Sequence, residues 1–231
     1  MVHVSVFQMI KENFSKVLRS AYNLVVMVVK RPRPDFSIET HFKGLICGID
    51  EAGRGSLAGP VVAAAVILDQ GRTPDGITDS KLLTQVKREH LFRKITTQAS
   101  IAVGFSEVEE IDKINILNGT LAAMERAVDD LTPAPAVALV DGNCSPKLDC
   151  SVHTVIGGDR LSLSIAAASI VAKVTRDRLM MSLARAYPGY GWERNAGYAT
   201  SEHLEALASH GVTPHHRRSF APVARASRPT N

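Results

Sequence analysis

Two acidic residues, Asp50 and Glu51, stand side by side within the glycine-rich stretch GIDEAGRGSLAGP, residues 48–60. Carboxylate oxygens are the ligands that hard divalent cations such as Mg²⁺ prefer. Two such ions can activate a water molecule and stabilise the leaving oxygen of a phosphodiester, and Asp141 and Asp159 could supply further ligands. Because glycine has no Cβ atom, the loop backbone could approach a sugar–phosphate strand closely. The pattern therefore favours a metal-dependent nuclease.

Two nucleotide-binding motifs fit the same stretch less well. A phosphate-binding Walker loop requires Lys followed by Ser or Thr, but Arg54 and Gly55 stand at those positions. The spacing of Gly53, Gly55 and Ala58 formally matches a dinucleotide-binding fingerprint. That motif must open a helix, whereas a glycine–proline pair and a β-like apolar run follow here. The two acids would also repel a pyrophosphate.

Each acid taken singly also has a simpler structural explanation. Asp141 precedes Gly142 and could belong to a turn, while Asp159 precedes Ser162 and could cap the helix that follows. Adjacent side chains of a strand point to opposite faces, so the two neighbouring acids meet at one site only if the chain turns there. Spacing alone therefore leaves a shared carboxylate site open.

The elements that must position these acids follow from the apolar pattern. Three strands early in the chain predict an antiparallel meander, and later strands alternate with helices, which together predict a mixed α/β sheet. Two of the strands end on acids. The predicted strands are 45–50, 60–68, 100–106, 136–141 and 152–156. The predicted helices are 82–97, 118–131, 162–187 and 201–209, and the alanine-rich part of the third should pack against the sheet.

The composition is that of a globular domain. The chain has 231 residues, of which 45% are hydrophobic and 22% charged, and its formal charge of +4 is compatible with a polyanionic partner. Three cysteines form no CxxC pair, which indicates free thiols in a reducing compartment, and we expect a cytoplasmic protein. His203, His215 and His216 have no cysteine at zinc-finger spacing and are interpreted as structural or phosphate-facing.

The N-terminal extension and the C-terminal tail are predicted to contribute no residue to catalysis. Residues 1–43 are expected to form an N-terminal extension, poorly ordered or a lone helix, and residues 44–231 the catalytic domain. The apolar run 24–29 is too short to span a bilayer. Two alternatives stay open for the extension: an amphipathic helix that lies on a partner or a membrane, or a start assigned too early with Met27 the true beginning. In either case we expect an appendage that takes no part in the chemistry. The region of about 188–223 is predicted to be helical and is followed by a basic tail.

Six stretches of the chain, in the same order, resemble bacterial ribonuclease HII over about residues 44–223. They are GIDEAGRG (48–55), TDSKLLT (78–84), INILNGTLAAM (114–124), VDGN (140–143), GGDRLSLSIAAASIVAKVTRD (157–177) and GYATSEHLEALASHGVTPHHRRSF (197–220). The resemblance implies an RNase H-like α/β fold: a five-stranded mixed sheet flanked by helices, with a small helical C-terminal region. It also implies hydrolysis of RNA in RNA/DNA hybrids and incision 5′ of single ribonucleotides in duplex DNA, leaving 3′-hydroxyl and 5′-phosphate ends.

Carried over by position, the resemblance assigns catalysis and metal binding to four carboxylates. It implies two divalent ions, Mg²⁺ or Mn²⁺, when substrate is bound. The four residues are Asp50, Glu51, Asp141 and Asp159.

The resemblance also assigns substrate contacts. Gly53, Arg54 and Gly55 would sense the 2′-hydroxyl at the RNA–DNA junction through backbone groups, since that hydroxyl distinguishes the two sugars. Tyr198 would stack on the deoxyribose after the ribonucleotide, and Lys81 would contact a backbone phosphate. The simpler alternatives are a core tyrosine and a solvated lysine, and both stay open.

Some features depart from the family pattern or leave alternatives. Ala196 stands where the family often has lysine, with Arg194 nearby, which puts one phosphate contact in doubt. A hybrid-binding module without catalysis, and a relative acting on another branched or hybrid substrate, stay open as other functions. We expect a monomer that binds nucleic acid and no membrane. The C-terminus carries no clear peptide for binding a sliding clamp.

Overall fold

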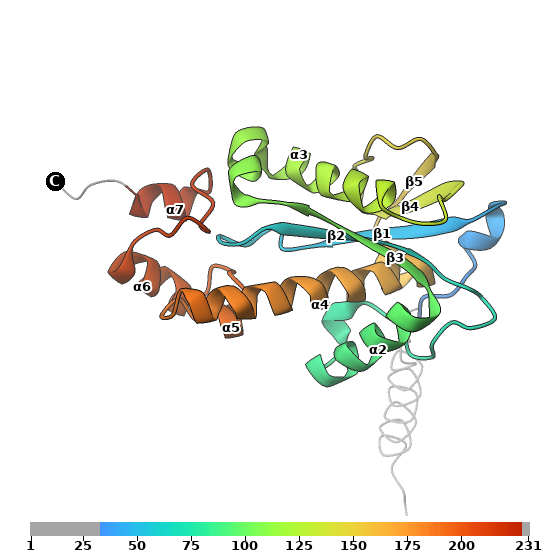
Figure 1. Ribbon diagram of the computed structural model, residues 1–231, viewed down its shortest axis with the longest axis horizontal. Coiled ribbons are helices and arrows are strands. Elements are labelled where there is room, and N and C mark those ends of the chain that lie inside the picture. The colour runs from blue at the N-terminus through green and yellow to red at the C-terminus, as the bar shows by residue number, and fades with distance from the viewer. Residues whose placement is uncertain (1–32, 228–231) are drawn as a thin grey trace, which may run out of the picture. The chain divides into compact units, whose positions relative to one another are not determined.

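The computed structural model describes residues 33–227, and its centre is one five-stranded mixed sheet in the order β3-β2-β1-β4-β5 (Figure 1). The first three strands form the predicted antiparallel meander, and β4 and β5 add in parallel beside β1. The predicted sheet is therefore confirmed, with strand boundaries shifted by one or two residues at most. The strands are β1 (Ile46–Ala52), β2 (Val61–Ile67), β3 (Ser100–Ser106), β4 (Val137–Asp141) and β5 (Ser151–Val155).

Helices cover both faces of the sheet, which explains why the central strands are apolar on both sides. Every residue of β2 is buried. Figure 1 shows α3 (Val108–Asp129) on one face and α4 (Leu163–Ala186) with α2 (Gln85–Gln98) on the other. Alternate β2 residues accordingly join two different apolar clusters, one beneath α3 and one beneath α4. A parallel or mixed sheet covered in this way reads as a continuous apolar run in the sequence.

The alanine-rich helix α4 packs directly on β1, as predicted. A Cβ atom added to Gly48 would lie 2.0 Å from the backbone carbon of Ser164, so strand and helix backbones are in contact there. Ser162 caps the helix by accepting a hydrogen bond from the amide of Ile165. The cap is thus Ser162, and Asp159, three residues earlier, is free for another role.

Helix α3 begins ten residues before the predicted start at residue 118. Within it, Asn115 adopts φ 69°, and its side chain accepts hydrogen bonds from the amides of Leu117 and Asn118. Asn115 therefore caps a second helical segment inside the element. The sequence pattern detected this second segment and missed the first, which runs from Val108 to the kink.

A small helical region follows α4, in agreement with the prediction. It packs on the C-terminal half of α4 through a cluster that includes Met180, Tyr190 and Trp192. Its helices are α5 (Trp192–Asn195), α6 (Ser201–His210) and α7 (Ala221–Ala226). The described residues also form three short 3-10 helices: η1 (Glu39–His41), η2 (Ser80–Leu82) and η3 (Gly158–Arg160). Within residues 33–227, no helix is long and apolar enough to cross a membrane.

The segment just before β1 belongs to the described part of the chain. The ring of Phe42 lies 4.5 Å from that of His153, and Glu39 is buried against the start of α4. The predicted domain boundary between residues 43 and 44 stays a prediction. Residues 34–43 do contact the domain that follows them. The alternatives for the leader, an amphipathic helix or a start at Met27, lie outside the described residues.

Candidate active site

Parallel pairing of β1 and β4 brings two of the predicted carboxylates to the same end of the sheet. Asp50 follows Ile49 and Asp141 follows Val140, and these apolar residues are partners in the register. The Asp141 carboxylate accepts a hydrogen bond of 2.7 Å from the amide of Gly158, which fastens η3 to the end of β4. Asp159 is the middle residue of η3, so this contact brings the third carboxylate to the same end.

Glu51 lies inside β1, because the strand continues to Ala52 instead of turning at the acids. The two neighbouring acids nevertheless line one cavity. The Asp50 carboxylate accepts a hydrogen bond of 2.7 Å from the amide of Glu51, and Asp50 is only 6% exposed. The expectation that the chain turns at these acids was therefore wrong, although both residues line the same cavity.

Burial, and after it the charges of neighbouring carboxylates, raise the pKa values of the acids at this end of the sheet. Burial raises the pKa of Asp50 well above its usual value, and the charges of Glu51 and Asp141 raise it further. Burial also raises the pKa of Glu51. The pKa of Asp159 is raised by burial and by the charges of Asp79 and Asp141. This end of the sheet is therefore a concentration of negative charge that the protein only partly neutralises.

Three cations provide that partial neutralisation. Lys81 Nζ lies 3.7 Å from Asp159 Oδ2, and Arg160 Nε lies 3.9 Å from Oδ1 of the same residue. Arg54 Nη1 lies 3.8 Å from Glu51 Oε1. Burial lowers the pKa of Lys81, but the charges of Asp159 and the other acids raise it overall, so this lysine stays protonated. Its side chain is largely exposed and free to meet an anion.

Asp79, which was not singled out from the sequence, holds the backbone of Lys81 in place. Asp79 caps η2 by accepting a hydrogen bond of 2.9 Å from the amide of Lys81. It is 8% exposed and acts on the pKa of Asp159. The signal for it was present, since Asp79 stands in the stretch TDSKLLT that carries the resemblance.

A cavity of about 470 Å³ collects most of the predicted residues. Its walls include Ser169 and Lys173 from α4, together with Ser80. Asp141 and Asp159 are not among the lining residues, but the charges of both raise the pKa of Asp50. The predicted residues that line the cavity are Asp50, Glu51, Gly53, Arg54, Gly55, Lys81 and Tyr198.

Two buried arginines hold the glycine loop of this cavity, and sequence reasoning missed both. Arg176 is 1% exposed and donates hydrogen bonds to the carbonyls of Pro60, Ala58 and Ala196 and to the hydroxyl of Ser56. Arg217 is fully buried, and its guanidinium donates hydrogen bonds to the backbone carbonyls of Arg54 and Gly59. Burial lowers the pKa of Arg217 to about 9. Both lie in stretches that carry the resemblance.

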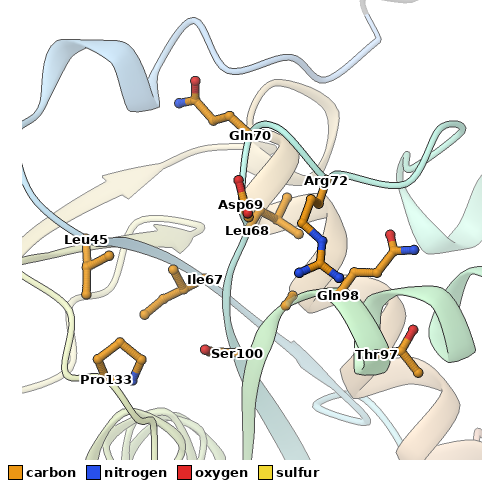
Figure 2. Close-up of a pocket in the computed structure, with 11 residues that line it drawn as sticks. Leu45, Ile67, Leu68, Asp69, Gln70, Arg72, Thr97, Gln98, Ser100 and Pro133 are labelled. Carbon is orange, nitrogen blue, oxygen red and sulfur yellow. The ribbon is translucent and has the colours of Figure 1, made fainter.

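A second hollow, of about 630 Å³, lies at the opposite end of β1 (Figure 2). Leu45, Ile67 and Pro133 form its apolar wall, and Asp69 and Arg72 are the charged residues among those that line it. It contains none of the predicted site residues. Its single acid and single base give it no set of groups comparable with the carboxylate cavity, which is therefore the candidate active site.

The carboxylate cavity fits a divalent cation by the chemistry of its donors. Within the described part of the chain, no three His, Cys, Asp or Glu side chains are already arranged as a metal-binding group. Mg²⁺ rarely needs such a cage, because it is usually bound by one or two carboxylates together with waters and substrate phosphates. The crowded carboxylates with raised pKa values supply the hard oxygen ligands and the negative charge for such a site.

The family model for Ribonuclease HII matches residues 47–223. The chain belongs to the ribonuclease HII family. A ribonuclease HII of Paramagnetospirillum magneticum is 58% identical over 195 residues, which cover 83% of this chain and 97% of that protein.

Solved structures agree with the assignment to the ribonuclease HII family. The ribonuclease H2 of Pyrococcus horikoshii OT3 has a TM-score of 0.67 at 29% identity, covering 79% of this chain and 96% of that one. Bst-RNase HIII in complex with Mn²⁺ has a TM-score of 0.65 at 21% identity, covering 79% of this chain and 68% of that one, and shows the shared fold. The predicted RNase H-like fold is thus confirmed. All the predicted carboxylates and substrate contacts lie within the matched residues.

Proposed function

We propose that this chain is a metal-dependent endoribonuclease that cleaves RNA in RNA/DNA hybrids and cuts 5′ of single ribonucleotides embedded in duplex DNA. Its products would carry 3′-hydroxyl and 5′-phosphate ends. The observation that carries the proposal is a cavity lined by Asp50 and Glu51 together with a glycine loop and a tyrosine, with Asp141 and Asp159 near enough for their charges to raise the pKa of Asp50. Membership of the ribonuclease HII family supports the same reaction.

Asp50, Glu51, Asp141 and Asp159 would hold two divalent ions, Mg²⁺ or Mn²⁺. When bound, such ions supply an activated water and stabilise charge on the leaving oxygen of a phosphodiester. The side chains are suited to this role because they are acceptor-only when ionised, and their repulsion falls when a cation is present. The hydrogen bond from Gly158 to Asp141 keeps η3, and with it Asp159, beside the strand ends.

The other residues of the cavity would bind and orient the nucleic acid. Lys81, protonated and exposed, would meet a phosphate oxygen as a point charge, releasing its contact with Asp159 in exchange. The backbone of Gly53, Arg54 and Gly55 would contact the 2′-hydroxyl of the ribonucleotide.

Tyr198 stands opposite the loop with an exposed ring. It is 40% exposed and lines the cavity, which excludes the alternative of a buried core tyrosine. An aromatic face at this place would stack on the sugar next to the ribonucleotide. The loop and the ring would together select the RNA–DNA junction, whereas the carboxylates would act on the phosphate between the two nucleotides.

The test is a panel of end-labelled duplexes incubated with Mg²⁺, Mn²⁺ or EDTA. The panel contains an RNA/DNA hybrid, a DNA duplex with one ribonucleotide, an all-DNA duplex and an all-RNA duplex. We expect metal-dependent cutting of the first two alone, with the single-ribonucleotide duplex cut on its 5′ side. Equal cutting of the all-DNA duplex would contradict the proposal. Binding of the hybrid with no cleavage under either metal would favour a binding module instead.

A further inference from the structure

Two histidines behind Tyr198 form a buried hydrogen-bond network. His203 and His216 are 0% and 1% exposed, and their Nε2 atoms lie 3.1 Å apart. Trp192 Nε1 lies 3.0 Å from the same Nε2 atom of His203. On the other side of its ring, His203 Nδ1 lies 2.9 Å from the backbone carbonyl oxygen of Tyr198. A chain of contacts therefore runs from the core of the C-terminal region to the tyrosine of the cavity.

The partners of each nitrogen fix where the protons are. An indole nitrogen can only donate and a carbonyl can only accept, so His203 accepts at Nε2 and donates from Nδ1. The amide of Thr213 donates to His216 Nδ1 over 3.0 Å, so His216 carries its proton on Nε2 and donates it to His203. Both rings are therefore neutral, and His203 is the Nδ1–H tautomer. Burial supports this, because it lowers the pKa of His203 and that of His216, the latter to about 4.

The His203 contact completes the fastening of the Tyr198 backbone. The Tyr198 carbonyl also accepts a hydrogen bond of 2.8 Å from Thr200, and its amide donates one of 2.9 Å to the carbonyl of Asn195. The residue two before it, Ala196, adopts φ 48°, a left-handed conformation that is uncommon for residues other than glycine. A segment in such a conformation persists only where its surroundings hold it. Arg176 holds this segment at the carbonyl of Ala196, and His203 holds it at the carbonyl of Tyr198.

We propose that His203 is a positioning residue for Tyr198, and that His216 fixes the His203 tautomer that can donate to the tyrosine carbonyl. The inference rests on the proposed function, because it assumes that the Tyr198 ring contacts the substrate. His203 itself touches no reacting atom. It acts by keeping the ring in place at the junction of ribonucleotide and deoxyribonucleotide.

Two substitutions at His203 separate positioning from general stability. Asn places an amide nitrogen near the former Nδ1 and can restore the donor to Tyr198, whereas Gln reaches toward the former Nε2 and leaves the carbonyl without that donor. We expect His203→Gln to lower kcat/KM on the single-ribonucleotide duplex roughly ten- to a hundredfold, mainly through KM. His203→Asn should recover most of that loss. Equal losses in both variants, following their melting temperatures, would overturn the inference.

A double-mutant cycle tests whether His203 acts through Tyr198. Tyr198→Ala should lower kcat/KM, and adding His203→Gln to it should change kcat/KM less than about twofold, because no ring remains to be positioned. Independent, multiplying losses would overturn the inference. Full activity of Tyr198→Ala would overturn both the inference and the proposed role of the ring.

The tautomer is measured on the unsubstituted protein, so the test survives if a variant fails to fold. Long-range ¹H–¹⁵N correlation spectra at neutral pH should show His203 protonated at Nδ1 and His216 protonated at Nε2. A His203 ring protonated at Nε2 would overturn the inference. Absence of cleavage by the unsubstituted protein would overturn the proposed function, and the spectra would still decide the His203 contact.

Discussion

The guanidinium carbon of Arg176 lies 5.7 Å from the centre of the Tyr198 ring, so one buried cation contacts the tyrosine of the cavity and also the glycine loop opposite. Its hydrogen bonds to Pro60 and Ala58 hold the chain that leaves the loop. A Cβ atom at Gly53 would lie 1.8 Å from Arg176 Nε. The two sides of the cavity therefore share one rigid support.

The position of Arg176 predicts that substitution by alanine destabilises the protein at Gly53 but not at Gly55. Gly53 has φ +91° and no room for a side chain, so Gly53→Ala must displace Arg176 or change the backbone. We expect a loss of about 1–3 kcal/mol in the free energy of unfolding, measured by chemical denaturation. In Gly55→Ala the added carbon would meet only the Tyr198 ring, at 3.8 Å, and stability should stay within about 0.5 kcal/mol.

Cleavage separates the roles of the two glycines further. Because Gly55 lines the cavity, Gly55→Ala should cut the single-ribonucleotide duplex roughly tenfold more slowly while folding normally. If Gly53→Ala were as stable as the parent protein, the support by Arg176 would not be what holds the loop. Unchanged cleavage by Gly55→Ala would remove the loop backbone from the substrate contact.

The crowded carboxylates predict that loss of one charge stabilises the protein. The folded state raises the pKa of Asp50, so it binds its proton more tightly than the unfolded chain does. The free energy of unfolding therefore increases as pH falls from the pKa of Asp50 in the folded protein to its lower pKa in the unfolded chain. Above that interval, the ionised carboxylate destabilises the folded protein. Asp50→Asn keeps the acceptor for the Glu51 amide and should raise the free energy of unfolding at pH 7 by about 1–3 kcal/mol in EDTA.

Asp130, an exposed residue at the end of α3, provides the matched control. Asp130→Asn should change the free energy of unfolding by less than about 0.5 kcal/mol. Urea denaturation of both variants and of the parent protein is the measurement. A less stable Asp50→Asn would show that the site is not under electrostatic repulsion.

Lys81 should contribute one phosphate contact. Removing it in Lys81→Met should weaken binding of all duplexes alike and reduce the slope of log K against log salt concentration by about 1. The control is Lys43, an exposed residue that precedes the start of β1, the end of the strand remote from the carboxylates. Lys43→Met should leave the slope unchanged. Fluorescence anisotropy at several salt concentrations, in EDTA, gives both slopes. An unchanged slope in Lys81→Met would assign Lys81 to balancing Asp159 alone.

The buried His216 predicts a specific loss of stability in mild acid. Its pKa is lowered from 6.5 to about 4 by burial, so between these values the unfolded chain binds a proton that the folded protein does not. Stability from this group is complete above pH 6.5 and is lost as pH falls toward 4, by at most about 3 kcal/mol. His216→Asn should therefore differ most from the parent protein at pH 7.

The difference between the two proteins isolates the histidine, because the carboxylates titrate alike in both. Denaturation of each at pH 7, 6, 5 and 4 should show a gap that narrows steadily and becomes constant below pH 4. A gap of constant size from pH 7 to 4 would mean that folding does not shift the pKa of His216, which would contradict its burial as a neutral ring.

Elements with a regular pattern of apolar residues could be predicted from the sequence. Strands buried on both faces appear as continuous apolar runs, so β2 was found almost to the residue. A helix interrupted by its own cap does not repeat in this way, and the first part of α3 was missed because Asn115 breaks the pattern. The acids were singled out because two of them are adjacent and because two of the predicted strands end on acids, at Asp50 and Asp141.

Contacts between distant parts of the chain could not be predicted from spacing. Arg176 donates to Pro60 across 116 positions, and Glu39 accepts from Ser162 across 123. A buried arginine without a carboxylate partner looks in the sequence like any surface arginine, since its partners are backbone carbonyls. Glu39 likewise looks like a surface acid until the structure places it 2% exposed beside the cap of α4.

The most direct test of the carboxylate site is cleavage of a DNA duplex with one ribonucleotide by matched aspartate-to-asparagine variants in Mn²⁺. Asp50→Asn, Asp141→Asn and Asp159→Asn should each fold and lose more than roughly a hundredfold in rate. Asp130→Asn should cut on the 5′ side of the ribonucleotide at the parental rate. Near-parental cleavage by any of the three folded site variants would contradict a shared four-carboxylate centre.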